Sequence, residues 1–255
     1  MKRFEGQVAI VTGASDGIGR ATADILARDG ASVLLVARNA PRLDAAVAAI
    51  RETGGRAAGL AADATQQATA AEAVEQVLRD WGRLDILVNN VGGSTIIENR
   101  TASIDELGFD DWNKLLSFNL DAMFHFCQAA VPVMKKARFG KIVNVSSVAG
   151  RGLGTAGCGY VAAKAAIVGV TKRMASEVGP WNINVNATAP ALTVTDRLKE
   201  FWHGRGEAAQ QDYLAQIPLR RVSTAVDQAN VICFLASAEA GFLTGLTLNV
   251  DGGQH

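Results

Sequence analysis

The chain of 255 residues is poor in the residues that build disulfide frameworks and metal sites. It has three cysteines, an odd number that lie far apart, so we expect no disulfide framework and a reducing compartment. The three histidines show no metal-ligand spacing with each other or with the cysteines, so no metal site is expected. These residues are Cys127, Cys158, Cys233, His125, His203 and His255.

The sequence also lacks an excess of charge of either sign and a long apolar run. Basic and acidic residues number 25 each, so no net field attracts nucleic acid or an anionic membrane. No stretch approaches the ~18 uninterrupted apolar residues that a membrane span requires, and residues 1–6 do not resemble a signal peptide. We therefore expect a cytoplasmic protein that binds neither nucleic acid nor membranes.

Hydrophobic residues are plentiful, at 49% of the chain, and they recur in short runs separated by helical patterns. Near-continuous Val, Ile and Leu runs are typical of strands buried on both faces of a parallel sheet. The intervening stretches place apolar residues at helical spacing, as at Ile18, Ala21 and Ile25. The expected strands are residues 8–11, 32–37, 57–62, 86–89, 141–146, 183–189 and 247–250.

This alternation predicts an α/β fold, a Rossmann-type doubly wound parallel sheet of about seven strands with helices on both faces. No repeat or linker divides the chain, so we expect one coenzyme-binding and catalytic domain over residues 1–255. Two segments interrupt the alternation, a polar connection at 92–110 and a long irregular stretch at 190–224. Ligands bind at the carboxyl ends of the strands in such sheets, so we interpret 190–224 as a substrate lid; a tolerated surface insertion is the alternative.

A glycine-rich sequence, Thr-Gly-Ala-Ser-Asp-Gly-Ile-Gly over residues 12–19, follows the first expected strand and leads directly into a helix. Glycines permit a tight turn and a close approach of the backbone to a pyrophosphate, which the helix N-terminus then stabilises. The spacing differs from the common dinucleotide fingerprint, and an ordinary strand–helix turn is the alternative. The expected coenzyme contacts are Gly13, Ser15, Asp16, Gly17, Ile18 and Gly19.

The end of the second expected strand bears on the choice between NADP(H) and NAD(H). Folds that prefer NAD place Asp or Glu there to bind the ribose 2′-hydroxyl, whereas an Arg accommodates the 2′-phosphate of NADP. Here the strand ends in Val36-Ala37-Arg38-Asn39, without a carboxylate. A guanidinium suits bidentate contact with a 2′-phosphate, so NADP(H) is favoured and NAD(H) is not excluded. The alternative is that Arg38 is a solvated surface residue.

A candidate acid–base pair lies further along the chain, where Tyr160 and Lys164 are spaced by one helical turn. A phenol has a pKa near ~10 and is a poor acid or base at neutral pH. An adjacent ammonium is expected to favour the phenolate and lower that pKa, which makes the tyrosine a usable acid/base. Ser147, thirteen positions before Tyr160, offers a hydroxyl that can orient the group being protonated.

Together these motifs resemble those of the short-chain dehydrogenase/reductase family, and the resemblance covers essentially the whole chain. Besides the glycine loop, the matching motifs occur in the family's order. They are Asp63, Asn89-Asn90-Val91-Gly92, Asn119, Ser147, Tyr160 with Lys164, and the segment 246–253. Within the family the sequence is similar to the branch of 3-oxoacyl-acyl-carrier-protein reductases and many secondary-alcohol dehydrogenases.

The resemblance implies a role for each matching residue. It implies that Tyr160 is the catalytic acid/base and that Lys164 is its pKa-lowering partner and a ligand of the nicotinamide ribose. Ser147 is implied to bind the substrate oxygen, and Asn119 to hold a water that links Lys164 to solvent. The implied coenzyme contacts further include Asp63, Ala64, Asn90, Pro190, Thr193 and Thr195. The chain departs from the family pattern at Val91, Ala191 and Thr193.

The expected activity is hydride transfer between a nicotinamide coenzyme and a ketone or secondary alcohol, with a 3-oxoacyl thioester as one candidate substrate. An NAD-dependent dehydrogenase of a small or cyclic secondary alcohol is one alternative, and a non-catalytic NADP-binding regulator or scaffold is another. Apolar residues in segments 112–136 and 160–178 exceed the needs of one sheet face, which favours a subunit interface. A dimer or tetramer is expected, with a small carbonyl compound or alcohol as the other partner.

Overall fold

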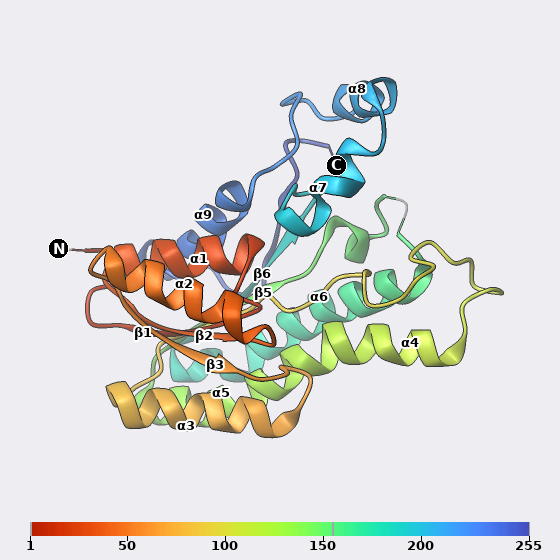
Figure 1. The fold of residues 1–255 in the computed structure, drawn as a ribbon. Coiled ribbons are helices and arrows are strands. Elements are labelled where there is room, and N and C mark those ends of the chain that lie inside the picture. The colour runs from red at the N-terminus through yellow and green to blue at the C-terminus, as the bar shows by residue number, and fades with distance from the viewer. Residues whose placement is uncertain (1, 155, 255) are drawn as a thin grey trace.

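The computed structural model describes residues 2–154 and 156–254, and a single seven-stranded sheet forms its centre (Figure 1). The strand order is β3-β2-β1-β4-β5-β6-β7, and all neighbouring strands are parallel. This confirms the predicted doubly wound α/β sheet. The strands are β1 (Val8–Thr12), β2 (Ser32–Ala37), β3 (Arg56–Ala61), β4 (Ile86–Asn89), β5 (Gly140–Val145), β6 (Ile183–Pro190) and β7 (Thr247–Val250).

Helices cover both faces of the sheet and bury its apolar side chains in two separate clusters (Figure 1). On one face, side chains of α1, α2 and α9 pack against alternate residues of β1 and β2; on the other, side chains of α3, α5 and α6 do the same. The helices are α1 (Gly17–Arg28), α2 (Ala40–Glu52), α3 (Gln67–Trp81), α4 (Phe109–Leu116), α5 (Ala122–Ala137), α6 (Cys158–Val178), α7 (Asp196–His203), α8 (Glu207–Ala215) and α9 (Ala225–Leu235).

The strand order reverses between β1 and β4, and this reversal opens a crevice at the carboxyl edge of the sheet. The chain leaves β1 toward β2 and β3 on one side, then returns to place β4 on the other side of β1. Crossovers on opposite faces diverge at such a point, so the loops that follow β1 and β4 are held apart. Those two loops carry the glycine-rich sequence and Asn90.

The segment 190–224 differs from the irregular stretch expected from the sequence, because it contains the two helices α7 and α8. Both stand above the carboxyl edge of the sheet in Figure 1, apart from the layers that cover its faces. The ring of Trp202 is buried and lies edge-on to Tyr213, with 5.7 Å between ring centroids. This contact joins α7 to α8, so the excursion has a small apolar core of its own.

The long apolar segment expected at 112–136 is divided into α4, a π-helical turn (Ser117–Asp121) and α5. Met123 and Phe126, which the sequence suggested for a subunit interface, are instead buried against the sheet at 3% and 0% exposure. Phe124 is 51% exposed. Many of the apolar residues of this segment therefore pack within the molecule, because they cover one face of the seven-stranded sheet.

None of the helices within residues 2–154 and 156–254 combines the length and apolar character needed to cross a membrane. No group of three or more His, Cys, Asp or Glu side chains in the same residues is placed to hold a metal ion. His255 lies outside the described residues.

Candidate active site

One large cleft, of about 1110 Å³, lies at the carboxyl edge of the sheet, where the strand order reverses. Its size exceeds the ~300–1,000 Å³ of typical small-molecule sites, and it has room for a coenzyme beside a substrate. Among the predicted site residues, only Gly19 and Asn119 do not line it. The others do: Gly13, Ser15, Asp16, Gly17, Ile18, Arg38, Asp63, Ala64, Asn90, Ser147, Tyr160, Lys164, Pro190, Thr193 and Thr195.

Residues of the glycine loop line the cleft beside the start of α1. Gly13 and Gly17 have φ of +64° and +57°, in the left-handed region that favours glycine. Asp16 caps α1 by accepting a hydrogen bond from the backbone N–H of Gly17 at 2.6 Å. The loop therefore turns tightly and presents the N-terminus of α1 to the cleft, which is the arrangement that binds a pyrophosphate.

Asn90 supports this loop from the neighbouring strand instead of pointing freely into the cleft. Its side-chain amide donates to the carbonyls of Thr12 and Gly13, at 3.0 and 3.2 Å. Gly19 lies directly behind, where an added Cβ would stand 2.5 Å from the Asn90 amide nitrogen. Gly19 thus allows α1 to pack close to the loop, and its contribution to the site is indirect.

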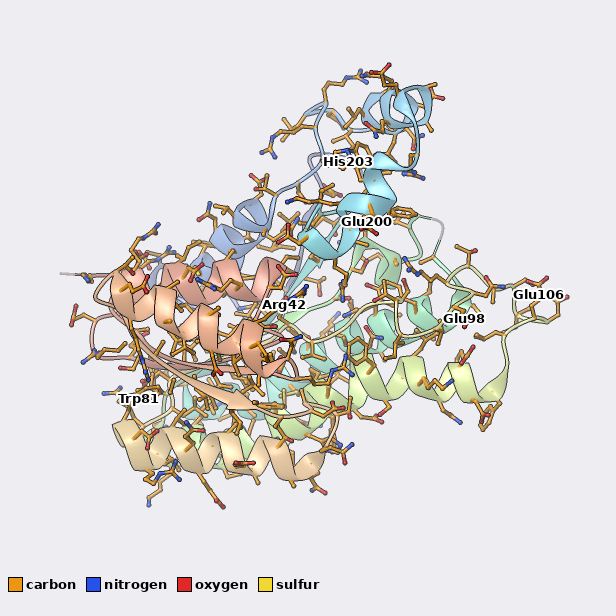
Figure 2. All side chains as sticks on the ribbon, in the orientation of Figure 1. Arg42, Trp81, Glu98, Glu106, Glu200 and His203 are labelled. Atoms are coloured by element: carbon orange, nitrogen blue, oxygen red, sulfur yellow. The ribbon has the colours of Figure 1, made fainter. Side chains whose placement is uncertain are left out.

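A second group of residues lines the cleft after β2 and β3. The Arg38 side chain is exposed, and its guanidinium lies over the Phe118 ring, 5.3 Å from the centroid. Arg42, in the first turn of α2, lines the same end, and Figure 2 shows it on the side of α2 that faces α7. Asp63 accepts a hydrogen bond from the backbone N–H of Thr65 at 2.9 Å, which fixes the turn after β3.

Lys164 and Tyr160 reach the cleft because hydrogen bonds fix α6 against the end of β5. The Ser146 hydroxyl donates to the Lys164 carbonyl at 2.8 Å, and the Asn144 amide donates to the Thr171 hydroxyl at 2.9 Å. Gly150 makes the approach possible, because a Cβ there would stand 2.5 Å from the Lys164 backbone. The first turn of α6 is therefore held over the carboxyl ends of β5 and β6.

The electrostatics of the pair differ from the sequence-based expectation, and the predicted lowering of the phenol pKa by Lys164 is wrong for this structure. Burial raises the pKa of Tyr160, while the Ser147 hydroxyl and the charge of Arg197 act in the opposite direction. The Lys164 ammonium instead donates to the Val145 carbonyl at 2.9 Å, and it lies 5.7 Å from the centroid of the Tyr160 ring. Burial, followed by the charge of Arg197, lowers the pKa of Lys164 to about 7.

Asn119 is fully buried, in the π-helical turn between α4 and α5. Its side-chain oxygen accepts from the Gly93 backbone N–H at 2.8 Å, and its amide donates to the Gly93 carbonyl at 3.1 Å. A Cβ at Gly92 would stand 2.6 Å from the Asn119 oxygen and 2.7 Å from the Lys164 nitrogen. Asn119 and Lys164 therefore flank the same short piece of backbone after β4, and Asn119 fixes its position.

Segment 190–195 crosses the cleft from β6 toward the glycine loop. Ser147 lies two residues after the end of β5, and its hydroxyl donates to the Pro190 carbonyl at 3.5 Å. The Thr193 hydroxyl bonds the Ser223 hydroxyl at 2.7 Å and thereby ties this segment to the end of the excursion. A Cβ at Gly17 would meet the Thr195 methyl group at 3.0 Å. The start of the excursion thus lies against the loop expected to bind the pyrophosphate.

Several residues that line the cleft were not among the site residues expected from the sequence, and they include Arg42, Arg100, Phe118 and Arg197. Arg197 follows Thr195 by two residues, and its guanidinium reaches across to donate to the Gly92 carbonyl at 3.4 Å. Phe201 of α7 also lines the cleft, whereas the neighbouring Trp202 turns away into the contact with α8. A single arginine within the stretch expected to be irregular carries no sequence signal, so the cleft position of Arg197 depends on the folded excursion.

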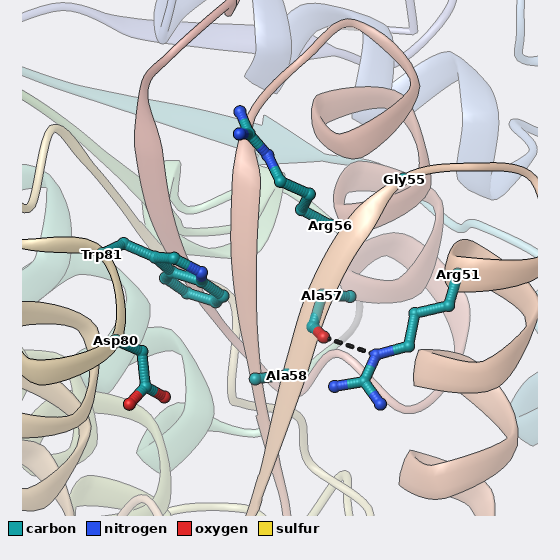
Figure 3. Close-up of a pocket in the computed structure, with 7 residues that line it drawn as sticks. All are labelled: Arg51, Gly55, Arg56, Ala57, Ala58, Asp80 and Trp81. Carbon is teal, nitrogen blue, oxygen red and sulfur yellow. Dashed lines mark hydrogen bonds between the residues drawn. The ribbon is translucent and has the colours of Figure 1, made fainter.

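A smaller hollow of about 370 Å³ lies at the outer edge of the sheet, beside β3 (Figure 3). The Arg51 side chain lies on one side of β3 and donates to the Ala57 carbonyl at 2.8 Å, and the indole of Trp81 lies on the other side. None of the predicted site residues lines it. The chemistry expected from the sequence is confined to the large cleft.

The fold and the cleft define an oxidoreductase of the Rossmann type, with a glycine loop for a dinucleotide and a tyrosine–lysine–serine group at its far end. A family model for short chain dehydrogenases matches residues 7–206, and the chain belongs to this family.

Similar proteins fall into more than one activity class. The chain is 37% identical to a 3-oxoacyl-[acyl-carrier-protein] reductase of Thermotoga maritima, over 98% of each chain. It is 41% identical to a cyclohexanol dehydrogenase of Rhodococcus sp. strain TK6, over 98% of this chain and 96% of the relative. The crystal structure of a xylitol dehydrogenase bound to NAD+ superposes with a TM-score of 0.89 at 30% identity, covering 99% of this chain and all of that one.

Proposed function

We propose that the protein reduces a ketone to a secondary alcohol with NADPH, and catalyses the reverse oxidation, at the large cleft. The observation that carries this proposal is the position of Tyr160, Lys164 and Ser147 around one end of the cleft, with the glycine loop at the other. The coenzyme's pyrophosphate is assigned to the N-terminus of α1. When bound there, NADPH supplies the hydride that the carbonyl carbon receives.

In this assignment Tyr160 donates a proton to the carbonyl oxygen as negative charge develops on it, and Ser147 donates a hydrogen bond to the same oxygen. Since burial raises the pKa of Tyr160, its phenol is protonated at neutral pH, which is the form that reduction requires. Oxidation requires the phenolate, so its rate is expected to rise with pH beyond the range in which reduction is fastest. Lys164 is assigned to the nicotinamide ribose. Asn119 positions the Gly92–Gly93 backbone, which lies between Asn119 and Lys164.

The preference for NADPH rests on the two arginines at the coenzyme end. Arg38 and Arg42 line the cleft after β2, where the 2′-phosphate of NADP is held in such folds. Asp63, Ala64 and Asn90 are assigned to the adenosine half, and Pro190, Thr193 and Thr195 to the nicotinamide half. NAD(H) remains an alternative, because the similar xylitol dehydrogenase structure holds NAD+ and Arg38 is exposed.

Segment 190–224 is proposed as the substrate lid of a single domain spanning residues 1–255. Its helices α7 and α8 stand over the carboxyl edge, and Thr195, Leu198 and Phe201 line the cleft from it. A homo-oligomer, a dimer or tetramer, and a cytoplasmic location also belong to this proposal. Of the residues that suggested a subunit interface, the exposed Phe124 on α5 is the one best placed to meet a partner.

Two substrate classes have support in the relatives: 3-oxoacyl thioesters from the Thermotoga reductase, and cyclic secondary alcohols from the Rhodococcus dehydrogenase. The test is oxidation of NADPH and NADH against a panel of acyl thioesters, cyclic ketones and steroid-like ketones. Activity on 3-oxoacyl thioesters alone selects the first class, and activity on cyclic ketones selects the second.

The variant Tyr160→Phe tests the chemistry directly. It is expected to retain NADPH binding, measured by coenzyme fluorescence, and to lose turnover by a factor of ~100 or more, since general acid catalysis typically contributes 10²–10⁴-fold. Near-normal turnover by this variant would contradict the assigned mechanism. NADPH binding without turnover of any carbonyl by the wild-type protein would instead select the non-catalytic regulator or scaffold.

A further inference from the structure

Arginine side chains dominate the charge around the substrate end of the cleft. Arg100, Arg197 and Arg205 line it from the segments on either side of Tyr160. Among the described residues, the carboxylates that line the cleft are Asp16, Asp63 and Asp196, and Asp196 forms an ion pair with Lys199 at 2.6 Å. This end of the cleft is therefore electropositive, although the chain as a whole carries no net charge.

Arg197 lies against the loop after β4, the short piece of backbone that Asn119 and Lys164 flank. Its guanidinium nitrogens would stand 3.2 and 3.3 Å from a Cβ at Gly93, the residue whose backbone Asn119 holds. Its charge acts on both Tyr160 and Lys164, lowering the pKa of each. The guanidinium therefore lies against the loop after β4, in the cleft that Tyr160 and Lys164 also line.

The contacts of Arg197 leave most of its hydrogen-bonding capacity for a ligand. Its one hydrogen bond among the described residues is the 3.4 Å contact to the Gly92 carbonyl, which is long for an N–H···O bond. None of the ion pairs formed by the described residues includes it. Arg205 differs, because its guanidinium lies between the Phe201 and Tyr213 rings, 5.3 Å from each centroid.

We propose that Arg197 binds a carboxylate of the substrate, so that the preferred substrates are oxo acids and hydroxy acids and not neutral ketones or alcohols. This inference rests on the proposed function, because it places the carboxylate beside the carbonyl that Tyr160 protonates. A single guanidinium matches the one negative charge of a carboxylate and can donate two parallel hydrogen bonds to it. α7 carries Arg197 on the lid, so the lid itself selects the substrate.

The test compares an oxo acid with its own methyl ester, which keeps the ketone and removes the charge. Suitable pairs are 4-oxopentanoate and 3-oxocyclohexanecarboxylate, each with its ester, reduced by the full-length protein with NADPH. The wild-type protein is expected to favour the acid in kcat/KM. Arg197→Gln is expected to lower the acid-to-ester ratio about ten- to a hundredfold, the range for hydrogen bonds to a charged group, and Arg197→Lys to restore part of it.

Lys172→Gln is the matched control, since it removes a positive charge at an exposed residue of α6 that does not line the cleft. It is expected to leave the acid-to-ester ratio unchanged. The wild-type ratio should also fall with added salt, because the proposed ion pair is partly exposed to solvent. A purely structural role of Arg197 would not produce this charge-specific and salt-dependent pattern.

Several results would overturn the inference. Equal kcat/KM for acid and ester in the wild-type protein, or an equal loss for both in Arg197→Gln, contradicts a substrate carboxylate at Arg197. Weaker NADPH binding by Arg197→Gln without substrate, measured by coenzyme fluorescence, would assign the arginine to the coenzyme instead. Turnover of esters alone, or turnover of the thioester and ketone panel without turnover of either acid, contradicts only this inference. No turnover of any of these carbonyl compounds contradicts the proposed function as well.

Discussion

Replacing Lys164 with methionine is expected to stabilise the folded protein below pH 7 while abolishing turnover. Burial lowers the pKa of this amine from an ordinary value of 10.5 to about 7. At 1.36 kcal/mol for each pKa unit, the folded state then bears a penalty of about 4–5 kcal/mol when the solution is acidic enough to keep the amine charged. The side chain is only 2% exposed, so solvent screens this penalty little.

The sign of the pH dependence follows from proton binding. Between about pH 7 and pH 10.5 the unfolded chain holds a proton on this lysine that the folded chain releases, so the wild-type protein gains stability as the pH rises. The methionine variant lacks this rise of stability with pH, because its side chain does not titrate. It also lacks the 2.9 Å hydrogen bond to the Val145 carbonyl, which offsets the gain by about 1 kcal/mol.

The net gain of about 3–4 kcal/mol at pH 6 corresponds to a rise in Tm of roughly 6–16 °C for a chain of this length. At about pH 10 the folded amine is neutral and the unfolded amine is only partly charged, so the penalty falls to about 1 kcal/mol, and the loss of the hydrogen bond cancels the gain. Thermal unfolding followed by circular dichroism at fixed protein concentration measures both values. Lys172→Met, at an exposed position of the same helix, is the control and should change the free energy of unfolding by less than about 0.5 kcal/mol. A lower Tm for Lys164→Met at pH 6, or the same gain at pH 6 and pH 10, would refute the reasoning.

Three further variants test other parts of the structure. Ala37→Asp combined with Arg38→Ala should shift the NADPH/NADH ratio of kcat/KM toward NADH by roughly tenfold or more, and an unchanged ratio would remove Arg38 from coenzyme selection. Gly19→Ala should weaken NADPH binding in a fluorescence titration, because its Cβ would stand 2.5 Å from the Asn90 amide; normal affinity would show that the loop can shift. Asp85→Ala should lower the free energy of unfolding by about 1–3 kcal/mol in urea, since the first amide of β1 donates to that carboxylate at 2.8 Å and would lose its partner.

The sheet and the glycine loop could be predicted from the sequence because local patterns determine them. Strands buried on both faces must be apolar at nearly every position, and the predicted bounds of all seven differ from the observed ones by one residue or less at each end. The turn before α1 requires left-handed backbone at Gly13 and Gly17. Glycine is favoured in that conformation, so the turn can be recognised from the glycines in the sequence.

The electrostatics of the site could not be predicted in the same way. The spacing of Tyr160 and Lys164 places both on one helical face, but the direction of the phenol pKa depends on burial and on what the ammonium contacts. Both are set by β5 and by the loop after β4, which lie far away in the sequence. The helices within 190–224 were missed for a related reason, since α7 and α8 are short and their packing depends on the contact between Trp202 and Tyr213.

The sequence by itself determined the fold class, and it predicted the place of the dinucleotide loop and the Tyr160, Lys164 and Ser147 group. These follow from local periodicity, from turn geometry and from a motif order that the chain shares with its family. Only the tertiary structure decided that burial holds Tyr160 as a neutral phenol, that Lys164 faces the Val145 carbonyl, and that Arg197 reaches the cleft. Charge–charge interactions and desolvation depend on distance in space, and the fold sets those distances by joining segments that are remote along the chain.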